Sequence, residues 1–153
     1  MFSRRLGALA LSLGLLTGLC SCERIFEDVG HVSLSREGES VRVAFCDALE
    51  VDTILVTTAH RGWSAGAFVE TVYIAKGKVS FPEGFVLSTQ EETDGLDVNL
   101  RLDPRLDEAN EVSVLASDRD SAPLVSVAFS LPSGGLPTDG WLQLDGSITE
   151  EAC

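Results

Sequence analysis

Apolar residues recur at every second position through most of the chain beyond residue 30. The alternation is clear in residues 40–45 and clearest in residues 96–102, where Leu, Val, Leu and Leu alternate with Asp, Asn and Arg. A period of two directs successive side chains to opposite faces of an extended strand, so that one face can enter a core while the other meets water. The pattern predicts half-buried β-strands and disfavours amphipathic helices.

Three further segments are apolar on both faces, and turn residues separate the expected strands at short intervals. The two-sided segments, which predict central strands, are residues 54–56, 112–115 and 124–129. Glycine and proline mark the turns at 76–78, 82–84, 93–95 and 121–123, and a longer loop at 133–140 precedes a last strand at 141–144. Regular short strands with such turns predict an antiparallel β-sandwich or barrel, and the helix described next favours a single sandwich.

One short helix is expected within this all-β chain. Asp103 is a suitable N-cap, Pro104 suits the first helical position, and residues 105–109 can form one turn. A helical crossover between the strands at 96–102 and 111–117 resembles the link that joins the two sheets of immunoglobulin-like domains. The resemblance covers about residues 94–129 and implies an immunoglobulin-like or related sandwich. The tryptophan and cysteine spacing of antibody domains is not reproduced.

The first 22 residues have the features of an export signal. A basic start with Arg4 and Arg5 precedes an uncharged apolar run over residues 6–19, which is short for a spanning helix. The run ends in Leu19-Cys20-Ser21-Cys22, which resembles the lipobox of bacterial lipoproteins. The resemblance implies lipidation at Cys22 rather than Cys20, because Cys20 would place the bulky Leu19 at the cleavage position.

This interpretation divides the chain into a signal peptide (1–21), a tether (22–30) and one sandwich domain (31–153). The chain carries 24 acidic and 11 basic side chains, and two of the basic ones, Arg4 and Arg5, leave with the signal. So acidic a surface repels nucleic acid. The expected location is the extracytoplasmic face of a bacterial membrane, with lipid on Cys22 as the attachment.

Two cysteines remain in the exported domain once Cys20 is removed and Cys22 is lipidated. Cys46 and Cys153 then predict a disulfide bond, because exported domains fold in an oxidising compartment. Two free thiols are the alternative. A bridge would hold the C-terminal residues, which otherwise fray.

The loop at residues 60–68 is the candidate binding site. His60, Arg61, Trp63 and Phe68 combine a cation with aromatic side chains between two expected strands. Arg and Trp often dominate binding surfaces. The alternative is that Trp63 folds back and caps the end of the sandwich.

The evidence for chemistry is weaker. His60 and His31 are the two histidines, and neither lies in a nucleophile motif. No zinc spacing occurs outside the signal region, and the acidic segments 91–97 and 118–120 do not match a calcium loop. We therefore expect no cofactor, no metal and no enzyme activity. The expected function is a membrane-anchored interaction module for an envelope protein or glycan, and the alternatives are a small envelope hydrolase and a calcium-dependent adhesion module.

Overall fold

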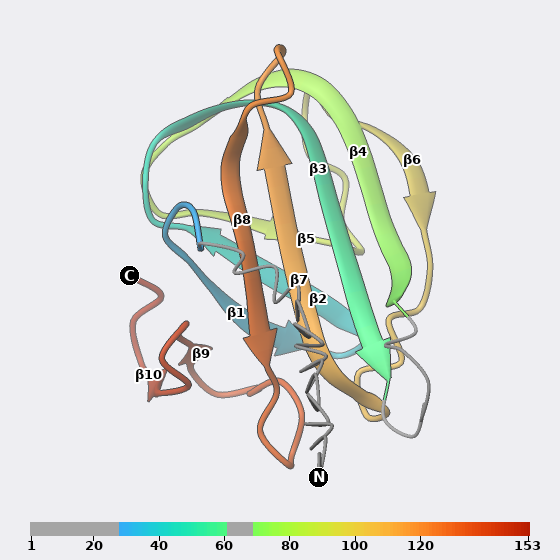
Figure 1. The fold of residues 1–153 in the computed structure, drawn as a ribbon, viewed down its shortest axis with the longest axis vertical. Helices are drawn as coiled ribbons and strands as arrows, with labels where there is room; N and C mark the ends of the chain where they lie inside the picture. The colour runs from blue at the N-terminus through green and yellow to red at the C-terminus, as the bar shows by residue number, and fades with distance from the viewer. Residues whose placement is uncertain (1–27, 61–68) are drawn as a thin grey trace, which may run out of the picture.

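Two antiparallel sheets of five strands each pack face to face in the computed structural model, which describes residues 28–60 and 69–153 (Figure 1). Sheet I has the strand order β10-β9-β1-β2-β5, and sheet II has the order β6-β4-β3-β7-β8. The described residues contain no helix. The predicted single β-sandwich is therefore confirmed.

The strands have the following bounds: β1 Val32–Glu37, β2 Ser40–Phe45, β3 Leu49–His60, β4 Val69–Phe81, β5 Phe85–Ser88, β6 Asp97–Arg101, β7 Ala109–Ser117, β8 Pro123–Ser130, β9 Trp141–Leu142 and β10 Ile148–Thr149.

The outer part of the β3–β4 pair extends beyond the other strands of sheet II. β3 pairs with β4 from Leu49 onwards but with β7 only from Thr53, so the first residues of β3 lie outside the main body of sheet II. A register shift between Val51 and Thr53 accompanies this change of neighbours. Such irregularities bend strands and increase their twist. Figure 1 shows β3 and β4 bending together at the top of the view.

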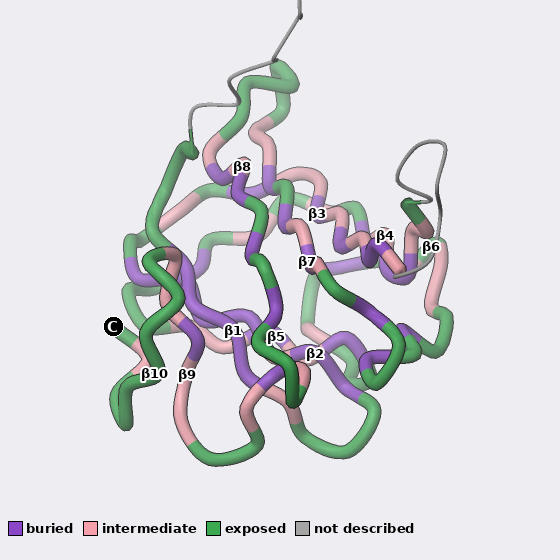
Figure 2. Tube along the Cα trace, turned by 60° about the horizontal axis from the view of Figure 1, so that its bottom comes forward, coloured by how far each residue is buried: buried purple, intermediate pink, exposed green. Residues whose placement is uncertain are grey.

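The core lies between the inner faces of the sheets, where Figure 2 shows the buried stretches of the strands. Phe45, Phe81 and Phe85 gather near the corner where the chain leaves β2. The ring centroids of Phe81 and Phe85 are 4.1 Å apart in a stacked arrangement, and those of Phe45 and Phe81 are 5.2 Å apart. Tilted and offset aromatic pairs add to the stabilisation from burial. The aromatic group thus joins sheet I to the outer part of the β3–β4 pair.

The alternation in residues 96–102 does not keep one face in the core. Leu96 is buried and Val98 packs against the core, but Leu102 is 42% exposed. The neighbours Ile74 and Ala75 on β4 pair with Leu100 and Val98, which lie two residues apart on β6. The extra residue in β6 forms a bulge, and Leu100 consequently lies opposite Ile74 instead of facing the core.

The expected helical crossover at residues 105–109 is not seen. Asp103 does not cap a helix: its Oδ1 accepts a hydrogen bond of 2.9 Å from the backbone N–H of Arg105, and Arg105 has a φ of 45°. This Asx-type turn gives Arg105 a left-handed conformation that a helix excludes. The strands that the segment joins, β6 and β7, lie in the same sheet, so it does not link the two sheets as the resemblance implied.

Two other expectations are also corrected. The segment 76–78 is not a turn, because Gly77 lies inside β4, where its missing side chain makes room for the carbonyl oxygen of Gly95. Residues 124–129 do not form a central strand, because β8 is an edge of sheet II. Residues 54–56 and 112–115 do lie in central strands, β3 and β7.

The C-terminal residues cover the outer face of β1. The predicted bond between Cys46 and Cys153 is present, with Cα atoms 5.5 Å apart across 107 residues of sequence. Beside it, the Ser33 hydroxyl donates a 2.6 Å hydrogen bond to the Ala152 carbonyl. Ser33 is fully buried and Ser35 is 2% exposed. Hydroxyls on an outer sheet face are normally solvated, so their burial indicates how closely later segments pack over β1.

We expect the double substitution Cys46→Ala/Cys153→Ala to lower the free energy of unfolding by about 3–5 kcal/mol, because it frees a long loop in the unfolded chain. Urea denaturation followed by fluorescence would measure the loss. Reduction of the unmodified protein should produce a similar shift. A change in the double variant below about 1 kcal/mol would contradict the assignment of this bond as a major constraint.

We expect Gly77→Ala to lower the free energy of unfolding by about 2–3 kcal/mol, because its methyl group would collide with the backbone of Gly95. Gly134→Ala is the matched control. A side chain at Gly134 meets no atom within 4 Å, so the change should stay within about 0.5 kcal/mol. Equal effects of the two substitutions would show that β4 and the 93–95 turn do not approach as closely as described.

Candidate functional site

His60 is the one described member of the predicted binding loop, at the end of β3. Arg61, Trp63 and Phe68 lie outside the described residues, so their predicted role in binding stays a prediction. β4 begins at Val69 on the other side of the loop. Around the loop, the structure describes the end of β3, the start of β4 and the segment 102–108, whose Arg105 contacts Glu70 of β4.

The His60 ring is held against β4 rather than presented to solvent. Its side chain is 7% exposed, and its Nε2 lies 3.2 Å from the Thr58 hydroxyl and 3.4 Å from Oε2 of Glu70. A catalytic triad needs the nucleophile and the carboxylate on opposite nitrogens of the ring. Here both contacts fall on Nε2, while Nδ1 is buried and has no partner among the described residues. The arrangement does not activate Thr58.

Glu70 is the centre of the polar cluster. Its Oε2 accepts a 2.6 Å hydrogen bond from the Arg105 guanidinium, in addition to its contact with His60. The bond from Arg105 is the main reason why the pKa of Glu70 lies below its usual value, against an opposing effect of desolvation. The same bond raises the pKa of Arg105. Both side chains are therefore charged at neutral pH.

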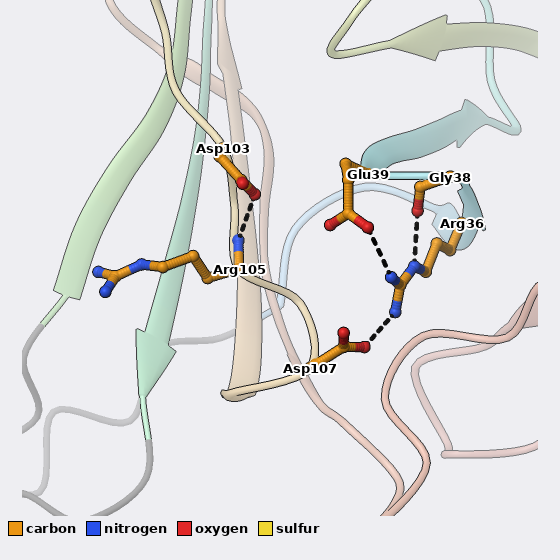
Figure 3. Close-up of polar contacts among 6 residues, drawn as sticks. All are labelled: Arg36, Gly38, Glu39, Asp103, Arg105 and Asp107. Atoms are coloured by element: carbon orange, nitrogen blue, oxygen red, sulfur yellow. Dashed lines mark hydrogen bonds and ion pairs between the residues drawn. The ribbon is translucent and has the colours of Figure 1, made fainter.

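A second arginine ties the same segment to the other sheet. Arg36 of β1 donates hydrogen bonds of 2.6 Å to Asp107 and to the carbonyl of Gly38, and one of 3.1 Å to Glu39 (Figure 3). The bond to Asp107 is the largest contribution to the raised pKa of Arg36. Arg105 and Asp107 extend to opposite sides of the segment in Figure 3.

The segment 102–108 thus closes this end of the sandwich. Between the two ion-paired residues, Leu106 is fully buried in the core. Its neighbours contact sheet II through Arg105 and sheet I through Asp107. Both ion pairs are largely solvent-facing, since Asp107 is 79% and Arg105 48% exposed, so the burial of Leu106 is the stronger attachment of the segment. The segment therefore contacts both sheets at this end of the sandwich.

The acidic segments do not assemble a metal site in the described part of the chain. No group of three or more potential His, Cys, Asp or Glu ligands occurs among residues 28–60 and 69–153. In the 118–122 hairpin, Oδ1 of Asp118 accepts hydrogen bonds of 2.9 Å from the backbone N–H groups of Asp120 and Ala122. This carboxylate therefore stabilises its own turn.

Sequence reasoning did not identify Glu70, Arg105 or Arg36 as members of a site. Glu70 lies 35 residues from Arg105, and Arg36 lies 71 residues from Asp107. No local motif connects such positions. The one local signal was Asp103-Pro104, which predicted the start of a helix where the structure has an Asx turn.

Comparisons with protein-family models, with curated proteins and with solved structures find no match to this chain. Over the described residues, no helix has the length and apolar character needed to cross a bilayer.

We expect Glu70→Gln to destabilise the fold at neutral pH and to lose this effect in acid. The pKa of Glu70 is lowered in the folded state from an ordinary value of 4.5, so its stabilising contribution is present above that value and disappears as the pH falls through the folded pKa. Urea denaturation of both proteins across the acid range would measure the difference. Glu108→Gln is the control, since Glu108 is 69% exposed and 4.0 Å from Arg105. A difference that grew in acid would contradict the assignment.

Proposed function

We propose that the chain is a bacterial envelope lipoprotein whose β-sandwich serves as a non-enzymatic interaction module held beside the membrane. Lipid on Cys22 would attach it to the extracytoplasmic face. The partner would be an envelope protein or glycan that binds at the end of the sandwich bearing His60. No cofactor, nucleic acid or metal takes part in this proposal.

The observation that carries the proposal is the short distance along the chain between the lipobox and the folded domain. The described fold begins at Asp28, six residues after Cys22, and Val29 already pairs with Ser126 of β8. Six extended residues span at most about 20 Å. A sandwich on so short a tether works at the membrane surface and not at a distance from it.

The polar cluster supports binding over catalysis. The side chains of His60, Glu70 and Arg105 contact one another, and this leaves none of them arranged as the base of a nucleophile. A small envelope hydrolase or a calcium-dependent adhesion module remains the alternative function. The two contacts on one nitrogen of His60 and the turn contacts of Asp118 give these alternatives less support.

The lipid anchor predicts different outcomes for two neighbouring cysteines. We expect Cys22→Ser to give an unprocessed precursor or a soluble product, because one acyl-bearing residue supplies the attachment. Cys20→Ser should leave a processed protein in the membrane fraction. Cell fractionation and intact-mass analysis would distinguish the forms. A fully processed Cys22→Ser protein that stays in the membrane would rule out anchoring at this residue.

A further inference from the structure

The outer face of sheet II carries a row of aliphatic side chains. Cross-strand pairing places Leu100, Ile74, Leu55 and Leu115 next to one another on β6, β4, β3 and β7. Leu115 is 37% exposed, and the other three are partly exposed. A contiguous apolar surface of this kind indicates a contact site.

A depression of about 230 Å³ adjoins the aliphatic row where β3, β7 and β8 run side by side. Leu55, Leu115 and Ala128 supply apolar side chains to it, and Thr57 and Ser113 supply hydroxyls. A closed apolar cavity of about 150 Å³ can hold benzene, so the depression has room for one ring of that size with a short chain.

Two carboxylates border the depression and lack a cation to balance them. Glu111 lies two residues from Ser113 on β7, and Oε1 of Glu111 accepts a 3.3 Å hydrogen bond from the Ser113 hydroxyl. Asp28 lines the depression on the β8 side, next to the bridge between Val29 and Ser126. Neither carboxylate has an ion pair among the described residues, and no described lining residue is a lysine, an arginine or a histidine. Such an edge attracts a cation carried on an apolar stem.

The spacing of these groups restricts what can bind them together. Glu111 and Leu115 lie four residues apart on one face of β7, which separates them by about 13 Å. In an extended peptide, every second side chain points to the same side, about 7 Å from the previous one. The long side chain of an arginine or a lysine can span the remaining distance. An aromatic residue and a basic residue separated by one residue therefore match both ends of the depression.

We propose that the depression binds an extended basic segment of a partner protein. An aromatic side chain of that segment packs on Leu55 and Leu115, and an arginine one residue further along donates hydrogen bonds to Glu111. Asp28 adds a second negative charge beside the guanidinium. The planar guanidinium suits a carboxylate better than an ammonium does, because it can donate two parallel hydrogen bonds.

The lining favours a protein segment over a glycan or a small amine. No aromatic side chain is among the described residues of the depression, whereas sugar rings usually bind by stacking on one. A small amine would fill the depression but leave Ile74 and Leu100 of the aliphatic row uncovered. A protein partner can cover both. The site lies on the face of sheet II and does not require lipid at Cys22, so the inference goes beyond the proposed function.

A peptide pair would test the role of charge. The probes are acetyl-Ser-Phe-Ser-Arg-Ser-amide and the same peptide with citrulline, which is neutral and similar in shape, in place of arginine. Each would be titrated into the full chain in lipid nanodiscs, with methyl NMR signals as the readout. We expect the methyl signals of Leu55, Leu115 and Ala128 to shift, and we expect the arginine peptide to bind about fivefold more tightly than the citrulline peptide.

Two substitutions would separate the contributions of charge and apolar contact. Glu111→Gln should remove the preference for arginine, and Glu83→Gln, at an exposed position outside the depression, should keep it. Leu115→Thr should weaken both peptides about threefold and leave their ratio unchanged. Equal binding of the two peptides to the unmodified chain would overturn the proposal, as would a preference for arginine that survives Glu111→Gln.

The same spectra would identify a different occupant. Nuclear Overhauser contacts from the Leu115 and Ala128 methyl groups to lipid acyl chains would identify the membrane, and contacts between differently labelled copies would identify a second copy of this chain. Either result, or the absence of methyl shifts at millimolar peptide, would overturn the proposal. None of these outcomes depends on how Cys22 is processed, so the anchor is tested separately.

Discussion

A two-layer sandwich buries the inner face of each sheet in a shared core and leaves two outer faces. What packs against each outer face is the main difference between the two sheets of this structure. On sheet I, later segments pack over β1, where Ala152 contacts Ser33 and Pro137 contacts Ser35. The bond from Cys46 to Cys153 holds the C-terminal residues there. On sheet II, the outer face carries an aliphatic row. The two faces therefore differ in what covers them, although the inner faces form one shared core.

The architecture could be predicted because it depends on local patterns. A period of two and turn glycines predicted the sandwich. The lipobox resemblance implied that Cys20 is removed and Cys22 lipidated, which left only Cys46 and Cys153 to form a disulfide bond. The bulge in β6 was not predictable in the same way. The residues 96–102 alternate without a break, and only their pairing with Ile74 and Ala75 shows that Leu100 turns away from the core. A register shift is a property of two strands, so one strand's sequence does not contain it.

The candidate site was predictable only at His60. Its neighbours Glu70 and Arg105 come from separate parts of the chain, and the direction of Arg105 depends on its positive φ. Asp followed by Pro is compatible with both a helix start and an Asx turn. The burial of Leu106 and the ion pairs on either side of it favour the turn, since they place one neighbouring residue against each sheet. Tertiary contacts therefore decide between the helix start and the Asx turn.

The direction of the chain at Val29 connects the fold to the proposed function. An antiparallel course along β8 leads from Ser126 towards the end of sheet II that bears His60, while the 118–122 hairpin with Asp118 and Asp120 lies at the opposite end. With the proposed anchor at Cys22, only six residues before Asp28, the sandwich would stay close to the bilayer. A partner bound at His60 would have to lie at the membrane surface.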